Sequence, residues 1–321
     1  MASPNLTELA TTTLRHRAPE LADNVTDNTA LLLRLKQKGN ARPVSGGRTI
    51  VEPLFYAENT TFKRYSGYET LDITPQDVIS AAEFDWKQCA VVVSISGLEQ
   101  LQNSGKEQLF DLLEARIKNA EQSFMNNLSV DIYSDGTANG GKQVGGLQLI
   151  VADAGTGTVG GINSSTYTFW QNQFYDFSSE SVTPSAATIQ HAMNVEYMEC
   201  SRNRDHPDLI VADDVYFRYY WESLQSIQRI TDEKMAAAGF QNLKFMGADV
   251  VFDGGQGGDA PASHMYFLNT KYIFYKPHSK RNMEVIGPDR YSTNQDALVR
   301  IIAWAGNMTC SNRSLQGVLV A

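Results

Sequence analysis

Apolar side chains recur at three- and four-residue steps between positions 105 and 128, the pattern of a helix that turns one face toward a core. Charged residues lie mostly on the other faces of this segment. The apolar positions are Leu109, Leu112, Leu113, Ile117, Ala120 and Phe124. At a rise of 1.5 Å per residue, the predicted helix is a rod roughly 35 Å long. A glycine-rich turn at 135–141 follows it.

Elsewhere short apolar runs alternate with helical stretches, which predicts an α+β protein. Runs typical of strands occur at 90–95, 147–153, 209–212 and 245–253, and again through much of 264–321. Two further helices are expected, one over 185–201 and one directly after the strand at 209–212. Asp213 or Asp214 is placed to cap the second of them, which explains this acidic pair better than a metal site does.

Aromatic residues are spread through residues 44–80 together with threonine and isoleucine, a composition typical of strands. The aromatic positions are Phe55, Tyr56, Phe62, Tyr65 and Tyr68. Turn residues between them predict a long two-stranded excursion from the body of the protein. An isolated hairpin is marginally stable in water, so we expect it to lie on a neighbouring subunit.

Two basic residues, Lys63 and Arg64, stand among these aromatics. Such a stretch could stack nucleic-acid bases. However, Glu52, Glu58 and Glu69 dilute the positive charge. Aromatic residues and arginine are also what protein interfaces enrich, so the sequence favours an interface between subunits.

Residues 1–43 form a polar, basic segment with too little apolar surface to fold alone. The segment has one apolar run, in which Leu31, Leu32 and Leu35 are expected to anchor it on its own or a neighbouring subunit. Its Arg15 and Arg17 are expected near acidic side chains, because the chain as a whole is acidic.

The whole chain has 321 residues, with 27 Lys and Arg against 36 Asp and Glu, and hence a net charge of −9. This balance argues against a dedicated nucleic-acid binder. Cys89, Cys200 and Cys310 are widely spaced and form no metal-binding pair, so we expect reduced thiols without a disulfide. The first residues do not resemble a signal peptide, and no apolar stretch is long enough to span a membrane.

Residues 155–161, GTGTVGG, contain the spacing of a dinucleotide-binding loop at Gly155, Gly157 and Gly160. That loop needs a helix directly after it, whose N-terminus holds the pyrophosphate. The following residues, INSSTYT, favour a helix poorly, so a flexible loop is the better interpretation. The five histidines form no close pair, and no nucleophile elbow or Walker loop is present. We therefore expect no catalytic residue, no metal site and no cofactor.

Two segments resemble the major capsid proteins of tailed bacteriophages. They are GGINSSTYTFWQN at 160–172 and PDLIVADDVYFRYYW at 207–221. The order of elements is similar as well, so the chain is expected to have the Hong Kong 97-type fold. The resemblance implies an N-terminal arm (1–43), an extended loop (44–80), a peripheral domain (81–140) with a spine helix (105–128), an axial domain (141–261), and peripheral C-terminal strands (262–321).

The resemblance also implies a function. The protein would be a structural shell subunit rather than an enzyme. It would assemble with its own copies into pentamers and hexamers of an icosahedral head around double-stranded DNA, in the host cytoplasm. Scaffolding, portal and decoration proteins are the further partners that the family suggests, and Arg15 and Arg17 could face the DNA on the inner wall. In some family members a loop lysine forms an isopeptide bond to a neighbour, and Lys63 stands where such a lysine could be.

Two alternatives remain open at this point. An encapsulin-type nanocompartment shell shares the fold of these capsid proteins, and it would be distinguished by an enclosed enzyme. The other is an oxidoreductase built on the glycines from Gly155 to Gly160, which would bind a nicotinamide cofactor.

Overall fold

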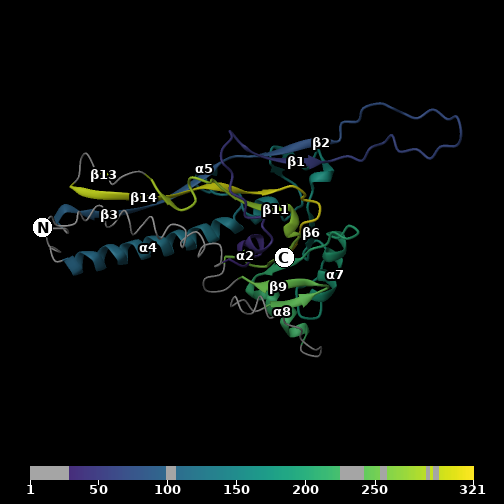
Figure 1. The fold of residues 1–321 in the computed structure, drawn as a ribbon. Coiled ribbons are helices and arrows are strands. Elements are labelled where there is room, and N and C mark those ends of the chain that lie inside the picture. The colour runs from purple at the N-terminus through teal and green to yellow at the C-terminus, as the bar shows by residue number, and fades with distance from the viewer. Residues whose placement is uncertain (1–28, 99–105, 225–241, 254–258, 287–289, 292–295) are drawn as a thin grey trace.

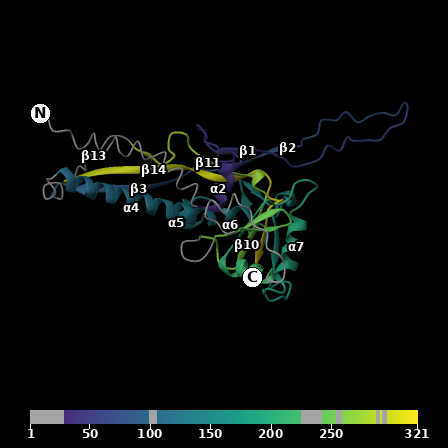
Figure 2. The same ribbon diagram turned by 60° about the horizontal axis from the view of Figure 1, so that its bottom comes forward.

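The computed structural model describes residues 29–98, 106–224, 242–253, 259–286, 290–291 and 296–321. These residues build an elongated rod of sheet and helix, a more compact lobe, and a long loop that projects away from both (Figures 1 and 2). Within the described ranges, no helix is both long enough and apolar enough to cross a membrane.

The rod is organised around β14 (Ala297–Cys310), the 14-residue strand at its centre. Along one edge, β14 pairs antiparallel with β3 (Lys87–Ser96), from Gly306 opposite Lys87 to Ala297 opposite Ser96. The long helix α4 (Lys106–Tyr133) runs beside this pair (Figure 1). The strands that pair antiparallel with β14 on its other edge are β11 (Ile273–Pro277), β12 (Glu284–Val285) and β13 (Arg290–Tyr291).

The predicted long helix is confirmed, and α4 continues beyond the expected end at 128 to Tyr133. Its apolar stripe continues as well, since Leu128 and Ile132 are buried together with Ile117 and Phe124. Leu128 and Ile132 repeat the four-residue step after Phe124, so the buried face extends the helix beyond the predicted end.

The strand expected at 90–95 is also confirmed, but it is not buried on both faces. Val93 and Ile95 are buried on one face, while Val92 on the opposite face is 56% exposed. Successive side chains of a strand point to opposite faces, so β3 covers α4 with one face only.

The lobe contains a six-stranded sheet in the order β6-β15-β10-β7-β9-β8. Its strands are β6 (Gln173–Asp176), β7 (Leu209–Ala212), β8 (Asn242–Phe245), β9 (Ala248–Phe252), β10 (His264–Leu268) and β15 (Gly317–Val320). The helices α7 (Ile189–Glu199) and α8 (Asp214–Ser223) belong to the same lobe (Figure 1). Both helices and the strands β7 and β9 were predicted from the sequence.

Two strands of the lobe correct the expected division of the chain. All of 262–321 was expected in the peripheral domain, yet β10 pairs with β7 and β15 pairs with both β10 and β6. The chain therefore enters the lobe's sheet, returns to the rod as β11 to β14, and enters the lobe again at its end. The apolar run at 147–153, expected as a strand, contains the short helix α6 (Leu147–Ile150) instead.

The predicted cap of α8 is present. The Asp213 side chain accepts a hydrogen bond from the backbone N–H of Tyr216 at 2.9 Å, and a second from that of Ser263 at 2.6 Å. The carboxylate thus satisfies a donor that the first turn of a helix leaves free. Asp213 has a structural role here, as the sequence suggested.

All three cysteines are free, and Cys200 and Cys310 are buried. Cys200 lies in the core of the lobe next to Glu196 of α7, whose side chain is fully buried. The Cys200 thiol donates a hydrogen bond to Glu196 Oε1 at 3.5 Å. Burial raises the pKa of Glu196 to about 8, so this carboxyl holds a proton in the folded protein at neutral pH.

The raised pKa makes stability depend on pH. The unfolded chain releases this proton above about pH 4.3, whereas the folded chain keeps it up to about pH 8, so stability falls as pH rises through that window. Glu196→Gln should remove this slope and raise the free energy of unfolding at pH 8 by a few kcal/mol, at about 1.4 kcal/mol per pKa unit.

Urea denaturation at pH 5 and pH 8 measures the effect. Glu222→Gln, an exposed change on α8 of the same lobe, serves as the control and should behave as the unchanged protein does. An equal difference between Glu196→Gln and the unchanged protein at both pH values would show that the carboxyl titrates normally.

Candidate assembly interface

The projecting loop begins and ends in a short antiparallel pair, β1 (Ile50–Phe55) and β2 (Ile79–Phe84). Side chains on β1 alternate strictly between buried and exposed, which fixes one face of the pair on the body. A small apolar core holds that face, and its buried members are Ile50, Leu54, Ala82, Phe84, Val159 and Trp170. The base of the loop is therefore rigidly attached to its own subunit.

The glycine-rich motif at 155–161 contributes to this base. It forms β4 (Thr158–Val159) and the turn of a hairpin whose second strand is β5 (Ile162–Asn163), so a strand stands where a dinucleotide fingerprint needs a helix. The carbonyl of Gly160 accepts a hydrogen bond from the N–H of Glu83 at 2.9 Å. A Cβ at Gly160 would approach Ala82 Cβ to 2.7 Å, so the glycine permits close packing. The cofactor interpretation of this motif is wrong.

A buried ionic contact also fixes the base. Glu52 of β1 is 5% exposed and forms an ion pair with Lys276 of β11. It also accepts a hydrogen bond from Thr309 Oγ1 of β14 at 2.6 Å. Removing one partner of a buried pair leaves an uncompensated charge, so these contacts tie the loop to the rod in one position.

Beyond the base, residues 57–78 extend far from the rest of the protein (Figures 1 and 2). The expected two strands are confirmed only at the base, because no strand is assigned between β1 and β2. Local side-chain contacts organise the loop instead. Asn59 and Asp72 each accept the N–H of the threonine two residues on, at 2.9 Å, and Thr60 bonds to Gln76 at 2.9 Å.

Four of the five aromatic residues singled out in the sequence are exposed to solvent in the subunit. Their exposed fractions are 82% for Phe55, 77% for Phe62, 62% for Tyr65 and 108% for Tyr68. The fifth, Tyr56, differs because its own subunit covers part of it. Its ring lies 5.6 Å from that of Phe169, and its hydroxyl donates to the carbonyl of Asp77 at 2.8 Å.

The two basic residues lie within the same surface. Lys63 forms an ion pair with Glu69 at 3.1 Å, and the Arg64 guanidinium lies 5.5 Å from the centre of the Phe62 ring. Exposed pairs of this kind contribute about 0–1 kcal/mol each, so they shape the loop more than they stabilise it.

Sequence reasoning missed three exposed apolar residues on the returning arm of the loop, namely Leu71, Ile73 and Ile79. Ile73 is 92% exposed. Leu71 and Ile73 each stand between polar residues in the sequence, so they do not form an apolar run. Their alternation with Asp72 and Thr74 was the available signal, since it is the pattern of an extended chain with one apolar face.

The leucines expected to anchor residues 1–43 on their own or a neighbouring subunit lie within their own subunit. They belong to α2 (Ala30–Gln37), where Leu31, Leu32 and Leu35 are fully buried in the subunit's own core, together with residues of α4 and of both large sheets. They leave no surface for a neighbour, so the anchor lies in the subunit itself and not at an interface between subunits. Arg15 and Arg17 lie outside the described residues.

Ionic contacts hold α2 against the lobe. Arg34 lies 3.1 Å from Asp208 and 3.3 Å from Asp249, and Lys38 lies 2.7 Å from Asp208. Burial opposes the charge on Asp208, but hydrogen bonds from Lys38 and Thr270 outweigh it and lower the pKa of this carboxyl. Arg34 and Lys38 thus meet acidic side chains within their own subunit, while the expectation for Arg15 and Arg17 stays a prediction.

No family model and no curated protein matches the sequence. Solved structures share its architecture. A chain of the cyanophage A-1(L) capsid asymmetric unit matches with a TM-score of 0.64 and 15% identity, over 88% of this chain and 91% of that chain. A chain of the satellite phage P4 procapsid matches with a TM-score of 0.51 and 11% identity, over 100% of this chain and 92% of that chain. A chain of the capsid of Myoviridae phage XM1 matches with a TM-score of 0.52 and 11% identity, over 89% of this chain and 91% of that chain.

These likenesses extend over 88–100% of the chain. The chain therefore has the Hong Kong 97-type fold of tailed-bacteriophage major capsid proteins.

Proposed function

We propose that this protein is the major shell subunit of a phage head, in which copies form pentamers and hexamers of an icosahedral shell around double-stranded DNA. The observation that carries the proposal is the projecting loop, which exposes Phe62, Tyr65 and Tyr68 far from the body of its own subunit. Large apolar side chains gathered on an exposed segment are typical of an interaction surface.

The loop supports contact with a second copy for an energetic reason. Burial of apolar surface contributes roughly 25 cal/mol per Å², and an aromatic ring buries on the order of 150–250 Å². Three such rings therefore give roughly 11–19 kcal/mol of gross burial free energy, which can offset the entropic cost of association. Each subunit would bind a neighbour through its loop and would be bound by another neighbour's loop on a different surface. Such head-to-tail contacts close into a ring when the rotation between neighbouring subunits divides a full turn evenly.

The charge of the chain supports the proposed relation to DNA. A net charge of −9 argues against sequence-specific binding of DNA by this protein, so the shell would enclose DNA without recognising its sequence. We also propose that scaffolding, portal or decoration proteins assist assembly in the host cytoplasm and that the mature protein resides in the virion. The structure of the satellite phage P4 procapsid includes a size determination protein, which gives one precedent for such a helper.

Negative-stain microscopy of the purified protein tests the proposal directly. We expect rings of five or six subunits, or closed shells, whose nuclease-protected content is DNA when the protein is expressed with its phage partners. A protein that remains monomeric at all concentrations, with or without those partners, would contradict it. Shells that enclose a protein instead of DNA would indicate a nanocompartment.

A further inference from the structure

A hollow of about 370 Å³ lies at the root of the projecting loop. Its lining comes from the chain where β1 ends and β2 begins, from the turn of the β4–β5 hairpin, and from the short helix η1 (Thr168–Trp170) with the residue before it. Two of the lining residues, Ile162 and Phe169, pack on the small apolar core of the loop base. The hollow is therefore held by the rigid part of the loop.

Aromatic rings form much of its wall. The Phe169 ring lies 5.6 Å from the ring of Tyr56, with the two planes inclined by 34°, and 6.1 Å from the ring of Tyr167, with the planes inclined by 60°. Tyr167 is 54% exposed, so its ring is open to a further contact. The face of an aromatic ring is the negative end of its quadrupole, and differently inclined rings around one space are typical of sites that bind organic cations.

The remaining lining suits the two parts of a long basic side chain. Among the described residues that line the hollow, Asp77 is acidic and none is basic. Asp77 is exposed, and Ile79 and Ile162 add apolar surface beside it. Lysine and arginine combine an apolar stem with a charged head. The isoleucines fit the stem, and the rings and the carboxylate fit the head.

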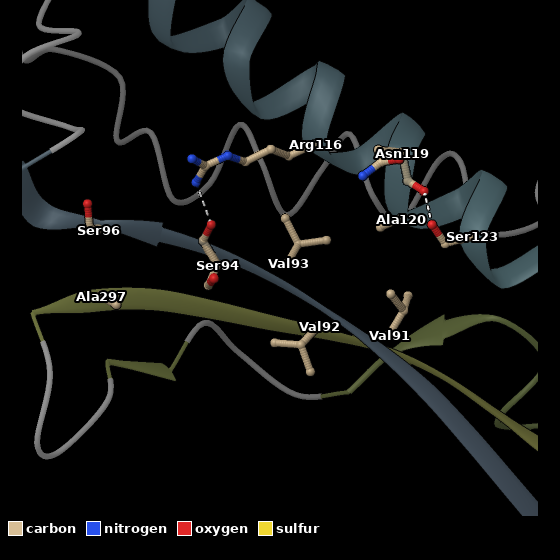
Figure 3. Close-up of a pocket in the computed structure, with 10 residues that line it drawn as sticks. All are labelled: Val91, Val92, Val93, Ser94, Ser96, Arg116, Asn119, Ala120, Ser123 and Ala297. Carbon is tan, nitrogen blue, oxygen red and sulfur yellow. Dashed lines mark hydrogen bonds between the residues drawn. The ribbon is translucent and has the colours of Figure 1, made fainter.

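The larger groove in the rod has the opposite character. It measures about 550 Å³ and lies between α4 and β3, and its described lining contains Arg116 but no acidic residue. Val91 and Val93 of β3 point toward the helix there, and Arg116 donates to the carbonyl of Ser94 at 2.6 Å (Figure 3). A cation of the subunit itself stands in that groove, so the groove does not attract a second one.

We propose that the hollow at the root of the loop binds an arginine or lysine side chain of a second copy of this protein. The inference rests on the proposed function, because the proposed shell brings a second copy against every loop. Residues 50–84 contain six acidic residues and two basic ones, so charge complementarity favours a partner surface that offers basic side chains. The root of the loop is then a receiving surface, whereas Phe62 and Tyr65 lie farther out on the loop.

Four single variants of the full-length protein test this inference. Asp77→Asn removes the charge and keeps the shape, and Tyr167→Leu removes a ring and keeps an apolar side chain. The matched controls, Asp77→Glu and Tyr167→Phe, retain the charge and the ring. Both residues are exposed, so all four variants should unfold thermally as the unchanged protein does. Sedimentation velocity of each purified protein then measures the association of its own copies, with no other partner present.

We expect Asp77→Asn and Tyr167→Leu each to raise the concentration needed for assembly by roughly tenfold, and the two controls to leave it unchanged. Equal assembly of all five proteins would overturn the inference and leave the proposed function standing. Stronger assembly of Asp77→Asn would overturn it as well, because an apolar occupant gains from the loss of the charge. A purified protein that stays monomeric at every concentration would overturn it together with the contact between copies on which it rests.

Discussion

Phe62→Ser combined with Tyr65→Ser should leave a folded subunit that no longer builds normal shells. Both side chains are more than half exposed in the isolated subunit, so their loss costs its own stability little. In a contact between subunits, truncation of a buried aromatic anchor costs on the order of 2–4 kcal/mol. Two such losses at every contact would weaken each association by a factor of more than about 100. Microscopy and sedimentation of the variant measure the change.

A ring-preserving variant, Phe62→Tyr with Tyr65→Phe, separates this effect from damage to the loop. It keeps the aromatic surface and should assemble normally. Circular dichroism and thermal unfolding should show all three proteins equally folded. Normal particles from the serine variant would mean that the loop aromatics do not anchor the shell.

Changing Leu31, Leu32 and Leu35 together to serine should prevent the subunit from folding. All three side chains are fully buried in the core that joins α2, α4 and both sheets. Each truncation of a buried leucine costs roughly 2–5 kcal/mol, and a buried hydroxyl without a partner adds to that cost. Three such losses match or exceed the whole stability of a typical domain, about 5–15 kcal/mol.

Single variants make this effect measurable. Leu32→Ala should lower the free energy of unfolding by roughly 2–5 kcal/mol in urea denaturation. Leu33→Ala is the matched control, because Leu33 lies on the same helix and is only half buried, so its cost should be clearly smaller. A soluble, cooperatively unfolding triple variant that merely fails to assemble would show instead that these leucines serve contacts between subunits.

Some features of the protein were readable in the sequence because they depend on neighbouring residues alone. The apolar spacing that defines α4 and the cap of α8 by Asp213 are of this kind, since helix periodicity and capping act within a few residues. The aromatic loop at 44–80 was recognisable for a related reason. So many aromatic side chains in a segment with turn residues cannot form a core of their own, and the segment had to project or pack on something else.

Tertiary structure decided the features that depend on partners far away in the chain. The strand β15 lies between β6 and β10, and its parallel partner β6 stands more than 140 residues earlier, so no local pattern could assign it to the lobe. The run of leucines near residue 31 indicates burial, but the same pattern would occur whether these side chains pack in their own subunit's core or against a neighbouring subunit. The glycines at 155–161 became a hairpin against the loop base because Ala82 and Glu83, distant in sequence, supply the surface there. Apolar pattern shows that a segment must be buried, but only the folded chain determines which surface buries it.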